Sequence, residues 1–73
     1  MDKSAFLRRM ETLLEISPES LKENTRLTDI PEWDSLALLG FIAMADREMN
    51  KQLATKDIVA SQTMADLYKL LED

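Results

Sequence analysis

The chain has 73 residues and a formal charge of −5, and it contains neither cysteine nor histidine. Its length allows one small domain, residues 1–73, whose thin core depends on efficient packing because no disulfide can staple it. Without a thiol or an imidazole we expect neither an enzyme nor a metal site, and without a basic stripe we expect no binding of nucleic acid.

An amphipathic helix is predicted from about residue 3 to residue 16. Its apolar residues follow the i, i+4, i+7, i+8 spacing of one helix face, and they are Phe6, Met10, Leu13 and Leu14. The proline of "SPES" then ends the pattern. The start has no long apolar run and no small-residue cleavage site, so we expect no secretory signal.

Residues 18–33 are polar and irregular, which predicts a long loop. Within it, Ser20 and Glu23 of "SLKE" match a capping box and predict a short turn of helix. The apolar residues expected to pin this loop to the helices are Leu21, Leu27 and Ile30.

The most apolar stretch predicts a central helix from Ser35 to Met49. Its uncharged run is too short to span a bilayer and is typical of a buried core helix. The expected wide apolar face, packed on more than one neighbour, comprises Leu38, Leu39, Phe41, Ile42, Ala45 and Met49. Ala37 and Gly40 are expected on the exposed side. Gly40 permits close approach either of a partner or of a neighbouring helix, and both interpretations stay open.

The remaining chain predicts a short helix, "KDIVA", capped by Thr55 and anchored by Ile58 and Val59. A last helix, "TMADLYKLLED", follows with Thr63 and Asp66 as its capping box. We expect four methionines to fill gaps in the core, namely Met10, Met44, Met49 and Met64. Since no segment alternates with strand period, the predicted fold is all-α, with three main helices, one short helix and a long loop after the first.

Two polar residues stand where the central helix begins. Asp34 suits the N-cap, and Trp33 and Leu38 would then form a hydrophobic staple across the helix start. Ser35 would be the first helical residue. One reading of Ser35 is a structural cap. The other is an attachment point for a phosphodiester, because a helix N-terminus offers unpaired N–H groups and partial positive charge.

At this point the sequence resembles the acyl carrier proteins. "WDSL" opens the central helix, and it is preceded by "LRRMETLLEI" and "ENTRLTDI" and followed by "ADREM" and "TMADLYKLL". The resemblance covers nearly the whole chain. It implies a small four-helix bundle, with three long helices and one short helix.

The resemblance also implies a function. A phosphopantetheinyl transferase would attach 4′-phosphopantetheine from coenzyme A to Ser35, and the thiol of that arm would carry acyl groups as thioesters. Asp34 matches the aspartate that helps the transferase dock, and Leu36 matches a leucine that partner enzymes touch. Gly40 and Ala43 complete the expected partner contacts.

The sequence departs from the family pattern in several places. The turns after the serine carry small residues where fatty-acid carriers are acidic, and Arg47 interrupts the acidic run near the helix end. We therefore expect a specialised carrier of a lipid, polyketide or surface-glycan pathway, served by its own acyl-loading ligase or synthase enzymes and recognised by shape more than charge. The alternatives are an aminoacyl carrier for D-alanyl or peptidyl groups and an arm-less helical adaptor. The expected protein is a cytoplasmic monomer.

Overall fold

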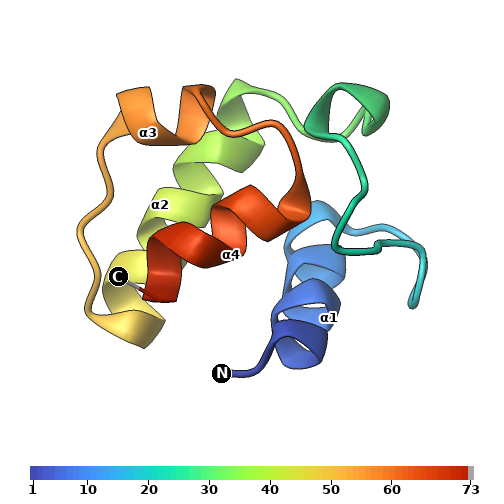
Figure 1. Ribbon diagram of the computed structural model, residues 1–73, viewed down its shortest axis with the longest axis horizontal. Coiled ribbons are helices and arrows are strands. Elements are labelled where there is room, and N and C mark those ends of the chain that lie inside the picture. Colours follow the sequence, from blue (N-terminus) through green and yellow to red (C-terminus); the bar gives the residue numbers. More distant parts are fainter. Residues whose placement is uncertain (73) are drawn as a thin grey trace.

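The computed structural model describes residues 1–72 (Figure 1). Its helices are α1 (Lys3–Leu14), the 3₁₀-helix η1 (Leu27–Asp29), α2 (Ser35–Met49), α3 (Thr55–Val59) and α4 (Met64–Glu72). No strand occurs in this part of the chain beyond an isolated bridge between Arg26 and Thr63. The predicted all-α class and order of helices are confirmed, and α2 has the predicted bounds. The predicted last helix also included Asp73, which lies outside the described residues.

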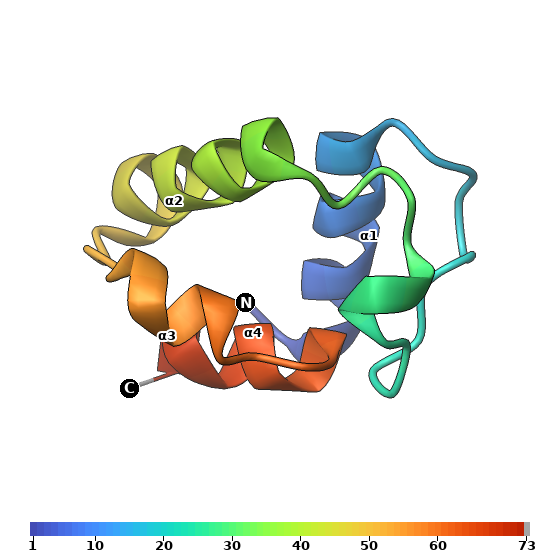
Figure 2. The same ribbon diagram turned by 90° about the horizontal axis from the view of Figure 1, so that it is seen from above.

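The helices surround a single apolar core. Figure 2 shows α2 along one side of the molecule, α3 and α4 along the other, and α1 with the long loop at one end. The thirteen buried apolar residues are Phe6, Met10, Leu14, Leu21, Leu27, Ile30, Phe41, Met44, Ala45, Ile58, Met64, Leu67 and Leu71. All three predicted loop anchors belong to this core, as do the predicted methionines except Met49, which is half-buried.

Helix α1 ends at Leu14, two residues before the predicted end. Glu15 adopts the left-handed conformation, with φ of 57°, and its N–H donates to the carbonyls of Glu11 and Thr12. The N–H of Ile16 also donates to the carbonyl of Glu11, at 3.0 Å. This reversal satisfies the last helical carbonyls and turns the chain before the proline is reached.

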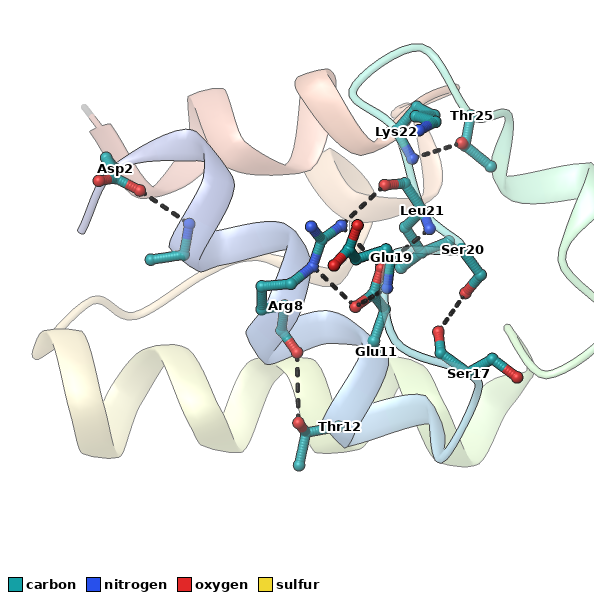
Figure 3. A network of polar contacts seen from close by, with 11 residues as sticks. Asp2, Arg8, Glu11, Thr12, Ser17, Glu19, Ser20, Leu21, Lys22 and Thr25 are labelled. Carbon is teal, nitrogen blue, oxygen red and sulfur yellow. Dashed lines mark hydrogen bonds and ion pairs between the residues drawn. The ribbon is translucent and has the colours of Figure 1, made fainter.

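The loop after α1 is organised by a buried carboxylate (Figure 3). Glu11 is only 3% exposed, and it accepts hydrogen bonds of 2.9 Å from the backbone N–H groups of Glu19 and Leu21. Arg8 donates to both of its oxygens at 2.8 Å and to the carbonyl of Leu21 at 3.1 Å. Burial by itself raises the pKa of Glu11, but these donors outweigh it and hold the pKa below its ordinary value.

The predicted helical turn at "SLKE" is wrong. The Ser20 hydroxyl donates to the carbonyl of Ser17 at 2.6 Å instead of capping a helix. The carbonyl of Glu23 accepts the N–H of Ala65 at 2.8 Å, which ties the loop to the start of α4. The loop forms its single helical turn later, at η1, where Leu27 enters the core.

The two C-terminal helices begin in different ways. Thr63 and Asp66 form the predicted capping box, because each backbone N–H donates to the other side chain, at 3.1 and 3.3 Å. Thr55, by contrast, is not a cap. It is the first residue of α3, whose N-cap is Ala54 and has no side-chain hydrogen bond.

The four aromatic residues of the chain form one continuous row through the core. Trp33 lies edge-on to Phe41 with ring centroids 6.1 Å apart, and Phe41 lies edge-on to Phe6 at 6.4 Å. Phe6 in turn packs against Tyr68 at 5.3 Å. Edge-to-face packing of this kind fixes ring orientation as well as burying area. The row therefore connects the segment before α2 to α1 and α4.

Candidate functional site

Asp34 performs the capping at the start of α2. Its Oδ1 accepts the N–H of Ala37 at 2.9 Å, and its carbonyl accepts the N–H of Leu38 at 2.9 Å. Ser35 follows as the first helical residue and is exposed. Within residues 1–72 the hydroxyl of Ser35 makes no hydrogen bond. The predicted N-cap is confirmed, and the serine is not needed for it.

The segment that precedes Ser35 is held in place. The N–H of Trp33 donates to the carbonyl of Ile30 at 3.0 Å, and the N–H of Asp34 donates to the carbonyl of Glu32 at 3.0 Å. Ile30 is buried, and Trp33 is half-buried against Phe41. The serine is thus presented at a fixed place, at the positive end of a helix of fifteen residues.

One side of α2 presents apolar side chains to the surface. Leu36 is 78% exposed and Leu39 is 60% exposed, and Ala43 is exposed one turn further along. Their i, i+3, i+7 spacing places them in one line, which we call the α2 stripe, and Arg47 continues it at i+11. Leu39 was expected in the core, and this expectation is wrong. Leu36 and Ala43 lie where a partner can reach them.

Gly40 does not belong to the α2 stripe. It is half-buried, and a Cβ built on it would lie 3.4 Å from Cδ1 of Leu13 in α1. Ala37 is also half-buried, and it packs against the core. The expected exposure of both residues is therefore wrong, because this side of α2 faces α1. Of the two interpretations of Gly40, the structure shows the close approach of a neighbouring helix.

A groove lies beside the start of α2. Its volume is about 480 Å³, and its lining residues are Leu27, Thr28, Ile30, Pro31, Trp33, Leu38, Ile58, Val59 and Ser61. Trp33 and Leu38 flank Ser35 in the chain, and none of the nine side chains is titratable. Val59 was expected in the core, but it is 69% exposed at the rim of this groove. The groove therefore suits an uncharged, apolar guest.

A second hollow, of about 280 Å³, lies in the long loop. It differs from the groove in carrying two carboxylate side chains, Asp29 and Glu32. The two share only Ile30 and Pro31. Trp33 and Leu38, two residues before and three residues after Ser35, line the groove and not this hollow, so the apolar groove is the one that belongs to the serine's surroundings.

Comparisons with known proteins identify no relative. No protein-family model matches the chain, and neither a curated protein nor a solved structure matches it.

Within residues 1–72, no three acidic side chains gather in a way that could hold a metal ion. In the same residues, no helix combines the length and apolar character needed to cross a membrane.

Sequence reasoning found Asp34 and Ser35 but missed two features of their surroundings. Leu36 and Ala43 of the α2 stripe were expected partner contacts, but Leu39 was assigned to the buried face by its spacing, so the continuous stripe was not predicted. The groove combines side chains from four separate segments of the chain, so no local sequence pattern predicts it. The signal that could have indicated the stripe is the pair Leu38 and Leu39, since adjacent helical residues point about 100° apart and cannot both face one neighbour.

Proposed function

We propose that this chain is an acyl carrier protein and that Ser35 carries the 4′-phosphopantetheine arm. The observation that carries the proposal is the hydroxyl of Ser35, exposed and relieved of capping by Asp34. The positive end of α2 favours a phosphate on that hydroxyl. The family resemblance of "WDSL" supports the same residue.

The attachment reaction needs only one atom from this chain. Oγ of Ser35 forms a bond to the pantetheine-side phosphorus of coenzyme A, and the diphosphate bond breaks to release 3′-phosphoadenosine 5′-phosphate. A base of the transferase takes the serine proton, since this chain has no histidine. When bound, the arm supplies the thiol that holds an acyl group as a thioester. Because the arm brings its own thiol, the carrier needs no cysteine, and this chain has none.

The groove favours acyl cargo over aminoacyl cargo. An aminoacyl group carries a protonated amine, and burying a charge without a partner is costly. None of the nine lining side chains offers a countercharge, whereas Leu27, Ile30 and Ile58 offer apolar contact. An uncharged acyl chain therefore gains from entering the groove, and a D-alanyl or peptidyl group with a free amine does not.

The α2 stripe is the surface proposed for partner enzymes, which comprise the transferase and the acyl-loading ligase or synthase. Leu36 and Leu39 expose apolar area beside Ser35, and exposed apolar patches mark interaction sites. Arg47 ends the stripe with a positive charge where fatty-acid carriers are acidic. The stripe thus suits a partner recognised by apolar contact, which supports a dedicated enzyme set of a specialised pathway.

The proposal is tested by incubating the purified protein with coenzyme A and a broad-specificity phosphopantetheinyl transferase. The intact mass of wild type should rise by one arm, and the mass of Ser35→Ala should not change. Ser4→Ala is the matched control, because Ser4 is an exposed hydroxyl residue that belongs to α1 and not to α2. Wild type that stays unmodified would instead favour the arm-less adaptor.

A further inference from the structure

The inner side of the groove is closed by the aromatic row. Trp33 lines the groove, and behind it the ring of Phe41 is 0% exposed. Phe41 is braced in turn by Phe6, which is also 0% exposed, with an interplanar angle of 77°. A guest that advanced past Trp33 would have to displace this packed row.

The floor of the groove is closed as well. Leu27, Ile30 and Ile58 line it and are at most 6% exposed, so they already belong to the core. Protein cores are packed at crystal-like density, and an inserted chain would force side chains out of their rotamers. The groove is therefore a shallow surface site that does not open into the core.

The size of the groove sets a scale for its guest. Its volume of about 480 Å³ holds on the order of 16 non-hydrogen atoms at the ~30 Å³ that each water occupies in the liquid. Three of these atoms are the sulfur, carbon and oxygen of the thioester, and part of the volume is open to solvent. The room left for the rest of the acyl chain is therefore on the order of ten carbons, about one fewer than the eleven that follow the carbonyl in dodecanoyl.

We infer that Trp33, backed by Phe41, limits the length of the acyl chain that this protein shelters to less than dodecanoyl. The inference rests on the proposed function, since the cargo reaches the groove from Ser35. Shorter apolar chains lie wholly within the groove, and the outer carbons of longer chains remain in water. Trp33 is thus a specificity-determining residue for cargo length.

The test uses acyl-coenzyme A substrates, from which a broad-specificity transferase installs acylated arms on Ser35. Acetyl, butyryl, hexanoyl, octanoyl, dodecanoyl and hexadecanoyl forms are prepared, and intact mass checks each one. The first readout is the emission of Trp33, the only tryptophan in the chain. The second is the rate at which hydroxylamine cleaves the thioester, which falls when the cargo is sheltered.

Each methylene that enters the groove should raise the ratio of sheltered to free cargo roughly fourfold. Protection and the blue shift of Trp33 should therefore grow up to octanoyl and be equal for dodecanoyl and hexadecanoyl. Protection that keeps growing between dodecanoyl and hexadecanoyl would overturn the length limit, and so would emission that ignores chain length. A protein that never takes an arm would overturn the proposed function itself, which the mass measurement shows separately.

Trp33→Ala provides the matched variant. Trp33 is half-buried, so its removal opens the inner wall while the core residues remain, and helical circular dichroism verifies the fold. Protection should then keep growing from dodecanoyl to hexadecanoyl. Leu53→Ala, which shortens a half-buried apolar side chain that does not line the groove, should leave the limit unchanged. An identical length profile in Trp33→Ala and wild type would remove Trp33 from the role.

Discussion

The carboxylate of Asp34 accepts the N–H of Ala37 at 2.9 Å, one turn into α2. This hydrogen bond satisfies one of the unpaired donors at the helix start, so Ser35 is not needed as a cap. Of the two adjacent residues, Asp34 is therefore the helix cap and Ser35 carries a free hydroxyl. Stability measurements can verify that separation without any partner enzyme.

Asp34→Ala should lower the free energy of unfolding by about 0.5–2 kcal/mol, the usual cost of losing an N-cap. Ser35→Ala should change it by less than about 0.5 kcal/mol, as expected for an exposed residue outside any network. Urea denaturation followed by circular dichroism measures both. A larger loss for Ser35→Ala than for Asp34→Ala would mean that the serine is the cap after all.

Asp34→Asn should separate capping from docking. Asparagine caps about as well as aspartate, so the urea midpoint should stay close to that of wild type. Arm attachment by the transferase should be slower if the negative charge helps it dock. The rate is followed by intact mass, and equal rates for the two proteins would remove Asp34 from the partner contacts.

Protonation of Glu11 should release the loop after α1. Its pKa lies below the ordinary value of 4.5 when folded, so its contribution to stability is present above that value and is lost as pH falls through the folded pKa. Unfolding free energy should therefore drop below about pH 4.5 in wild type. In Glu11→Gln this part of the pH dependence should be absent.

At neutral pH, Glu11→Gln should cost about 1.5–3 kcal/mol, the range for hydrogen bonds to a charged group. Glu32→Gln is the control, because Glu32 is exposed and its side chain makes no hydrogen bond within residues 1–72. Urea midpoints measured from neutral pH down to acid give both results. A pH profile of Glu11→Gln that parallels wild type would contradict the role of this carboxylate.

Gly40→Ala should stabilise the protein by about 0.5–1 kcal/mol, because alanine favours the helix and the added methyl meets Leu13 at an ordinary contact distance of 3.4 Å. Gly40→Glu should destabilise it instead, since a long charged side chain would be pushed against α1. Thermal unfolding distinguishes the two. Greater stability of Gly40→Glu than wild type would show that this position faces solvent.

The start of α2 could be predicted from the sequence because its determinants are local. Asp34 caps within one turn, and the Thr63–Asp66 box at α4 is equally local. The loop could not be predicted. Glu11 reaches N–H groups eight and ten residues away, and nothing in "RRMET" marks it as buried.

The orientation of the helix faces was harder to predict than the helices themselves. Spacing shows which residues share a face, but the neighbour that each face meets depends on the tertiary packing. A small residue such as Gly40 fits either an exposed helix turn or a close contact with a neighbouring helix. Only the tertiary packing shows that Gly40 faces Leu13. Val59 follows the buried Ile58 in a helix of five residues, too short for its pattern to decide which of the two is buried.

If the proposed function holds, Leu39→Gln should leave the fold intact and weaken recognition by partner enzymes. The side chain is 60% exposed, so the free energy of unfolding should change by less than about 0.5 kcal/mol. Attachment or loading by the protein's own enzymes should fall, and the loss should persist at high salt because it is apolar. Steady-state kinetics measure this. A loss that salt abolishes would mean that charge, and not the α2 stripe, carries recognition.

Fragmentation of the modified protein locates the added mass and so shows whether Ser35 alone bears the phosphopantetheine arm. After incubation with coenzyme A and the transferase, peptides of wild type and Ser4→Ala should carry the arm on Ser35. Peptides of Ser35→Ala should carry none, while its circular dichroism stays helical. An arm on another hydroxyl, or on the Ser35→Ala protein, would contradict the account.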